Sequence, residues 1–106
     1  MEISEMQTRA VTAAAFLKAI ANDNRLLILC ELLKGERSVG GLVPVVGVSL
    51  SALSQHLAKL RRHGLVKTRR QSQTIHYSLA DPGVAAVIAA LYERFCRPVA
   101  GQPIER

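Results

Sequence analysis

The sequence contains no tryptophan, only four aromatic residues and only two cysteines among its 106 residues. A core without large rings must be built from Leu, Val, Ile and Ala, which is typical of packed helices. Two cysteines are too few for a disulfide framework or for a self-contained zinc site of cysteine and histidine ligands. We expect residues 1–106 to form a single small domain that completes its core by pairing with a second copy.

Targeting segments and membrane spans are also missing. The first residues, MEISEMQT, have neither a basic region nor an apolar one, so no signal peptide is expected. The longest apolar run covers residues 84–92, far short of the ~20 residues that a membrane helix needs. We therefore expect a cytoplasmic protein with no membrane partner, associated with the nucleoid if it binds DNA.

Catalytic motifs are absent as well. The chain has no C-x-x-C, G-x-S-x-G or H-E-x-x-H motif and no phosphate-binding glycine loop. A thiol oxidoreductase needs two neighbouring cysteines, whereas 65 residues separate Cys30 from Cys96. We expect neither enzymatic activity nor a cofactor.

The most informative absence is that of Asp and Glu from residues 37–80. This window holds seven of the 14 Lys and Arg residues and all three histidines, whereas the rest of the chain holds seven basic and eight acidic residues. A solvated run of charge is the ordinary interpretation of basic residues. Cations confined to one acid-free window instead predict a surface for a nucleic-acid phosphate backbone, and a pure dimerisation module would have no use for it.

Periodicity and capping residues predict two helices before this window. The first starts at Ser4 or Thr8, ends near Ala21 and has an apolar arc wider than an ordinary surface stripe, so we expect it to contact a partner as well as its own domain. The second begins at an N-cap between Asn22 and Asn24 and ends at Gly35. Its apolar face is predicted to consist of Leu26, Leu29, Cys30 and Leu33.

Inside the window, a short helical segment precedes a polar-faced helix. Ser38 caps residues 39–46, where Gly40, Gly41 and Pro44 predict a distorted or partly 3₁₀ helix. The next helix starts at Ser49, and its buried stripe recurs at i, i+4 and i+7. Together the two segments resemble a helix-turn-helix with its polar face outward. The buried stripe is Leu53, Leu57 and Leu60.

A hairpin and a last helix follow. Residues 66–70 and 74–79 are predicted strands joined by residues 71–73. Asp81 and Pro82 start a helix as N-cap and N1 residues, and this helix ends before Pro98 with apolar residues on more than one face. We expect the terminal helices, about 5–21 and 82–96, to form a homodimer interface, and residues 98–106 to be a frayed tail.

This order of elements is that of a mainly α winged helix-turn-helix with a two-stranded β-hairpin. The segments ANDNRLLILCELL, SALSQHLAKLRRHGLV and TIHYSLAD resemble the ArsR/SmtB family of dimeric bacterial repressors, over roughly Phe16 to Cys96. The resemblance implies a homodimer bound to double-stranded operator DNA with an inverted repeat. It also implies that an inducer on the sensing helices releases the DNA.

Such a docking assigns roles to the exposed polar residues. Those of the polar-faced helix are expected to enter the major groove, where Gln pairs with adenine edges and Ser with several bases. Arg62 and the hairpin residues are expected to hold phosphates or to reach the minor groove. His56 lies at the edge of the buried stripe, where packing or capping is favoured over base reading. The major-groove set is Ser51, Ser54, Gln55 and Lys59, and the hairpin set is Arg69, Arg70 and Gln73.

Metal-sensing members of the family use ligand sets that this chain lacks. At the start of the third helix, where one set has Cys-x-Cys, the chain has Ser38-Val39-Gly40. A second set needs histidines on the last helix, which here offers Asp81 and Glu93 but no histidine. Metal sensing is therefore disfavoured, and no metal ligands are predicted.

The remaining pair, Cys30 and Cys96, resembles the sulfide- and persulfide-responsive branch of the family, the BigR- and SqrR-like repressors. The resemblance implies that a disulfide or a longer sulfur chain links the two cysteines when a persulfide or polysulfide inducer is present. Arg94 and Arg97 favour a thiolate at Cys96, which a helix C-terminus opposes, whereas burial raises the pKa of Cys30. We therefore assign Cys96 as the first thiol to react and Cys30 as the resolving thiol.

Two other functions fit the same fold and the same cysteines. One is a general thiol-redox sensor of oxidants, and the other is an antisilencing activator of the HlyU type within this family. The sequence does not separate either of them from a persulfide-responsive repressor.

Overall fold

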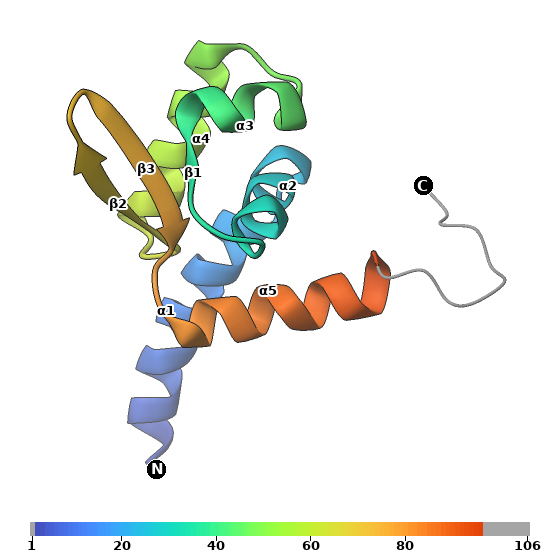
Figure 1. Cartoon of the computed structure of the whole chain (residues 1–106). Helices are drawn as coiled ribbons and strands as arrows, with labels where there is room; N and C mark the ends of the chain where they lie inside the picture. The colour runs from blue at the N-terminus through green and yellow to red at the C-terminus, as the bar shows by residue number, and fades with distance from the viewer. Residues whose placement is uncertain (1, 97–106) are drawn as a thin grey trace, which may run out of the picture.

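The computed structural model describes residues 2–96 (Figure 1). Four helices, the hairpin and the last helix follow one another as predicted, so the winged helix-turn-helix is confirmed. A short additional strand, β1, lies between the second and third helices. The elements are α1 (Ile3–Ile20), α2 (Asp23–Leu32), β1 (Arg37–Ser38), α3 (Val39–Val46), α4 (Leu50–Arg62), β2 (Val66–Gln71), β3 (Thr74–Leu79) and α5 (Pro82–Phe95).

Side chains cap four of the five helices at their N-termini. Asn22 accepts hydrogen bonds from two backbone N–H groups of α2, while Ser38, Ser49 and Asp81 each cap the helix that follows them. These starts agree with the predicted ones. The start of the first helix differs from the predicted one, because this helix begins at Ile3 without a side-chain cap.

The predicted caps of α1 lie inside the helix instead. The hydroxyl of Thr8 donates to the backbone carbonyl of Ser4, 3.1 Å away. A Ser or Thr hydroxyl can satisfy itself in this way within a helix as well as at its start. The residue type alone therefore did not fix the boundary.

The expectation of a distorted helix over residues 39–46 was wrong, because α3 is α-helical throughout. Pro44 removes one N–H group, and the buried side chains of Leu42 and Val46 anchor the helix on both sides of it. Gly47 ends α3 with a φ of 75°, a left-handed conformation that favours glycine. The chain then bends by 110° into α4, within the usual range for a helix-turn-helix.

The core lies between the C-terminal end of α1, the helices α2, α3, α4 and α5, and the base of the hairpin. The stripe of Leu53, Leu57 and Leu60 is completely buried, as predicted. On α2 the buried face is rotated from the predicted one, because this helix is apolar around most of its circumference and periodicity does not single out one side. The residues of α2 that face the core are Ile28, Leu29 and Leu32, whereas Leu26, Cys30 and Leu33 are half-buried.

The hairpin of β2 and β3 forms the wing. Gln71 lies opposite Thr74, so the connecting turn has two residues rather than the predicted three. Ser72 in this turn has a φ of 55°, and positive φ values are what two-residue hairpin turns require. Successive residues of β2 therefore point to opposite faces of the wing.

The strand β1 adds a third member to the sheet, whose order is β1-β3-β2. Its two residues, Arg37 and Ser38, pair antiparallel with Tyr77 and His76 of β3. A strand of two residues has no alternation that a sequence pattern could reveal. This pairing joins the wing to the segment that leaves α2.

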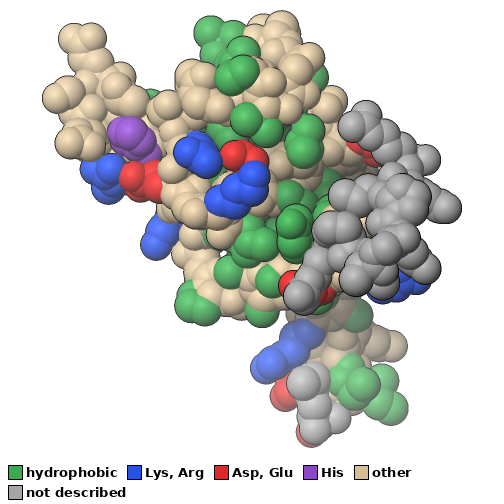
Figure 2. All heavy atoms as spheres, turned by 45° about the vertical axis from the view of Figure 1, so that its right-hand side comes forward, with side chains coloured by type: hydrophobic (Ala, Val, Ile, Leu, Met, Phe, Trp, Pro, Cys, Tyr) green, Lys and Arg blue, Asp and Glu red, His purple; other side chains and the backbone are tan. Residues whose placement is uncertain are grey.

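The terminal helices leave large apolar side chains exposed. On α1, Val11 is 73% exposed, and on α5, Phe95 is 66% exposed. The N-terminal end of α1 projects beyond α5, away from the rest of the fold (Figure 1). Figure 2, which brings the right-hand side of Figure 1 forward, shows hydrophobic side chains gathered across the middle of that face.

No single helix within residues 2–96 is long and apolar enough to cross a membrane, although the bent pair of α3 and α4 passes the same test by length and composition. The predicted tail, residues 98–106, lies outside the described residues.

Candidate nucleic-acid interface and thiol site

The exposed side of α4 carries every residue that the sequence predicted for it. The leucine stripe faces the core, which turns the other side of the amphipathic helix outward. Within residues 2–96, no ion pair joins Lys59, Arg61 or Arg62 to an acid. The positive charge of this helix is therefore free to act on a partner. The predicted residues found exposed are Ser51, Ser54, Gln55, Lys59 and Arg62.

A polar hollow of about 480 Å³ lies beside this surface, where Arg25 of α2 approaches α4. Arg25 is only 8% exposed. Its Nε donates to the carbonyl of Ala19 at 2.6 Å, and its Nη1 lies 3.5 Å from Nδ1 of His56. Sequence reasoning missed Arg25, because it lies on an otherwise apolar helix outside the acid-free window.

His56 is half-buried at the edge of this hollow. Burial lowers the pKa of His56, and the nearby charges of Arg25 and Lys59 lower it further. A neutral imidazole next to a buried guanidinium fits the packing role that we expected for His56. Its contact with Arg25 also ties α4 to the N-terminal end of α2.

Two arginines that are neighbours in β2, Arg69 and Arg70, lie on opposite faces of the wing. Arg69 donates from Nε and Nη2 to the two carboxylate oxygens of Glu36, at 3.1 and 2.6 Å. Arg70 points to the other face, where its Nε donates to the carbonyl of Ser72 at 3.1 Å. Gln73 is exposed in the turn. Of the three predicted wing residues, only Arg69 is thus held by an acid.

Glu36 was not singled out from the sequence, although it directly precedes the acid-free window. The hydrogen bonds from Arg69 are the largest cause of a lowered pKa for the Glu36 carboxyl, and the charges of Arg69, His76 and Lys67 act in the same direction. The same pair raises the pKa of Arg69. Nδ1 of His76 lies 3.9 Å from the Glu36 carboxylate.

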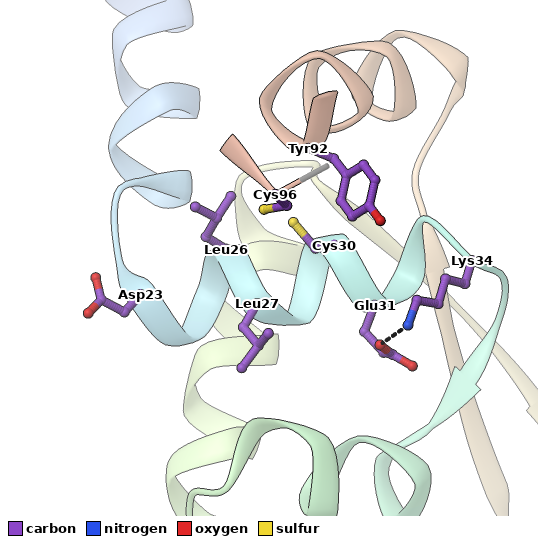
Figure 3. A pocket seen from close by; sticks show the side chains of 8 residues that line it. All are labelled: Asp23, Leu26, Leu27, Cys30, Glu31, Lys34, Tyr92 and Cys96. Carbon is purple, nitrogen blue, oxygen red and sulfur yellow. Dashed lines mark ion pairs between the residues drawn. The ribbon is translucent and has the colours of Figure 1, made fainter. Parts of the chain in front are cut away.

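The two cysteines meet although they lie far apart in sequence. Cys30 projects from α2 and Cys96 from the C-terminal end of α5, and their sulfur atoms lie side by side (Figure 3). Both are free, half-buried thiols. They line a largely apolar pocket of about 460 Å³. Its other lining residues are Asp23, Leu26, Leu27, Glu31, Lys34 and Tyr92.

The two thiols differ in their surroundings. Burial is the largest cause of a raised pKa for Cys30, and both the charge of Cys96 and a hydrogen bond with it add to the effect. The direction is the one expected from the apolar face of α2. Of the two arginines expected near Cys96, Arg94 stacks on the ring of Phe95 at 4.9 Å, and Arg97 lies outside the described residues.

Glu31 connects this thiol pocket to the sheet. Its carboxylate is nearly buried and forms ion pairs with Lys34 at 3.1 Å and with Arg37 of β1 at 3.3 Å. Figure 3 shows Glu31 on the pocket wall beside Cys30. Among the residues that the structure describes, no three His, Cys, Asp or Glu side chains are grouped as metal ligands.

Known proteins are similar to this chain in both sequence and fold. Residues 22–68 match the model of the bacterial regulatory protein, arsR family. The chain is similar to the transcriptional activator HlyU of Vibrio cholerae, with 48% identity over 92% of the chain and 90% of that protein. It is also similar to the nodulation protein NolR of Rhizobium meliloti, with 53% identity over 82% of the chain and 71% of that protein.

Solved structures of similar proteins have the same fold as this chain. Reduced HlyU from Vibrio cholerae superposes with a TM-score of 0.84 over 90% of this chain and all of that chain, at 48% identity. The transcriptional repressor BigR from Xylella fastidiosa gives a TM-score of 0.78 at 39% identity, over 92% of this chain and all of that one. A homodimeric winged helix-turn-helix DNA-binding domain from Mycobacterium bovis gives 0.80 at 31% identity, over 88% of this chain and 86% of that one.

Proposed function

The chain belongs to the ArsR family of bacterial regulatory proteins, and on this premise we propose that it is a homodimeric repressor that releases operator DNA when a sulfur bridge joins Cys30 to Cys96. The observation that supports the sensing function most strongly is the meeting of these two thiols, from two different helices, in one pocket. The unpaired cations of α4 support the DNA-binding function.

For DNA binding, α4 enters the major groove. Gln55 can donate to and accept from an adenine edge, and the hydroxyls of Ser51 and Ser54 can pair with several bases. Lys59 and Arg62 neutralise the backbone on either side of the groove. The wing contributes Arg70 and Gln73 to the neighbouring backbone or minor groove.

A second copy of the chain completes the DNA-binding surface. The exposed apolar side chains of α1 and α5 supply a surface that two copies can bury against one another. The related domain from Mycobacterium bovis is described as homodimeric. In such a dimer the two α4 helices must lie about 34 Å apart to enter successive major grooves.

The sensing chemistry starts with an organic persulfide, RSSH. The Cys96 thiolate attacks the outer sulfur, which forms a Cys96 persulfide and releases RSH. The Cys30 thiolate then attacks the inner sulfur of that persulfide, so that a Cys30–Cys96 disulfide forms and hydrogen sulfide leaves. Two thiols are oxidised and one persulfide is reduced. Bridging by a trisulfide consumes a second persulfide and retains one added sulfur.

The bridge acts through the helices that carry it. It tethers α2, which packs on the core and contacts α4 through Arg25, to the end of α5, which we assign to the dimer interface. A fixed distance between these helices changes the relative orientation of the two subunits. The two α4 helices then no longer match the groove spacing, and the DNA is released.

The experiment is a titration of operator DNA, selected from random duplexes, with reduced and persulfide-treated protein. Wild-type protein should lose affinity at least tenfold after treatment. Cys30→Ser and Cys96→Ser should bind DNA like the reduced wild type and keep that affinity after treatment. A double Cys30→Ser, Cys96→Ser variant that still releases DNA would rule out the thiol mechanism.

Hydrogen peroxide in place of persulfide tests the general oxidant sensor. If peroxide releases the DNA as effectively at equal concentration, the selectivity for reactive sulfur is wrong. Transcription in vitro from a promoter that contains the operator tests the direction of regulation. A repressor lowers transcript yield in the reduced state, whereas an activator of the kind that the name of HlyU indicates raises it.

A further inference from the structure

The acid-free window is acid-free in sequence but not in space. Two of its seven cations contact acids that precede the window. Arg37 pairs with Glu31 at 3.3 Å, and Arg69 pairs with Glu36. The positive surface available to DNA is therefore smaller on the wing than the residue count indicates.

Glu36 lies against one particular face of the wing. Arg69 and His76 are paired across β2 and β3, so their side chains share a face, and Lys67 shares it because it is two residues from Arg69. Glu36 comes from the turn between α2 and β1, and its side chain is 34% exposed. Arg70, next to Arg69, belongs to the opposite face.

The pairing geometry is that of phosphate recognition. A guanidinium presents parallel N–H groups that fit a carboxylate and a phosphate in the same bidentate manner. Both oxygens of Glu36 accept hydrogen bonds from Arg69, one from Nε and one from Nη2. The remaining nitrogen of the guanidinium, Nη1, donates to Oε1 of Gln71 at 3.3 Å. A backbone phosphate that binds Arg69 would therefore have to compete with partners already present, and on the Nε–Nη2 edge that partner is Glu36.

We infer that Glu36 occupies the phosphate-binding side of Arg69 in the DNA-free protein and thereby limits the affinity of the wing for DNA. The inference rests on the proposed DNA binding but not on the thiol mechanism. Exposed ion pairs are weak, so a phosphate can displace the carboxylate. The displaced Glu36 remains tethered beside the DNA as a negative charge, and the pair as a whole adds no net charge to the interface.

The test is the salt dependence of binding to a duplex of random sequence, measured by fluorescence anisotropy with the full chain. Glu36→Gln keeps the shape of the side chain and removes its charge. It should tighten binding by about two- to fivefold at low salt and steepen the slope of log K against log salt by about 0.9 per subunit. The double variant Glu36→Gln, Arg69→Gln should return to the wild-type slope.

Glu2→Gln is the matched control, because it makes the same change in net charge at an exposed residue that precedes α1 and lies outside the proposed dimer interface. It should leave the slope unchanged. An equal change in both variants, an unchanged slope in Glu36→Gln, or weaker binding by Glu36→Gln would each overturn the inference. If wild-type protein binds no duplex at all, it is the proposed DNA binding that fails.

Discussion

The recognition helix and the wing both present cations, yet the fold supports them differently. Three completely buried leucines hold α4, and its cations face no acid among residues 2–96. The wing is mostly exposed, and Arg69 is neutralised by Glu36. On α4, the cations counted in the sequence are therefore all available to a partner. On the wing, fewer cations are available than the sequence contains.

Stability should show the largest difference between the two regions. Leu57→Ala opens a cavity under α4 and should lower the free energy of unfolding by about 2–5 kcal/mol. Ile75→Ala, at a wing position that is 43% exposed, should cost about 0.5 kcal/mol. Urea denaturation followed by circular dichroism measures both. Equal losses would mean that the wing is as much a part of the core as α4 is.

Base reading should belong to the helix. Gln55→Ala removes the side chain best suited to an adenine edge and should reduce the preference for operator over random DNA by about 1–3 kcal/mol. Its salt slope should stay unchanged, since no charge is lost. Competition titrations with the two DNAs at fixed salt measure the ratio. A preserved ratio would move base reading away from Gln55.

The wing should supply affinity without sequence preference. Arg70→Ala should weaken binding to operator and random DNA by the same factor and make the salt slope shallower by about 0.9 per subunit. The same titrations repeated at several salt concentrations give the slope. An unchanged slope would remove Arg70 from the phosphate contacts.

The pH dependence of stability should show the smallest difference between α4 and the wing. The lowered pKa of His56 favours the folded state above the ordinary histidine value of 6.5, and this contribution is lost as the pH falls through the lowered value. The lowered pKa of Glu36 likewise favours the folded state at higher pH, but this contribution to stability is lost only below the ordinary glutamate value of 4.5. Urea titrations from pH 7 to pH 4 should therefore separate His56→Gln from wild type first. If Glu36→Gln departs from wild type at the higher pH, the assignment is reversed.

Much of the fold could be predicted because local signals were strong. Ser38, Ser49 and Asp81 occupy their predicted capping positions, and the leucine repeat of α4 determined which face is buried. The helical conformation around Pro44 and the rotated face of α2 could not be predicted, because packing against other elements decided them. The strand β1 exists only through its pairing with β3.

The candidate site likewise contains residues that local sequence signals predicted and residues that they did not. The exposed residues of α4 followed from periodicity, and the meeting of Cys30 with Cys96 agrees with the family resemblance. Arg25 and Glu36 were missed, because their roles come from contacts with residues 31 and 33 positions away in the sequence. Only the folded chain brings such groups together.

In the proposed mechanism, a sulfur bridge between Cys30 and Cys96 releases DNA. The most direct measurement treats the protein–operator complex with a substoichiometric amount of persulfide, separates bound from released protein, and determines the intact mass of each fraction. The bound fraction should keep two free thiols. The released fraction should be lighter by about 2 mass units for a disulfide, or heavier by about 30 for a trisulfide. Released protein with both thiols intact would show that DNA is released without a sulfur bridge.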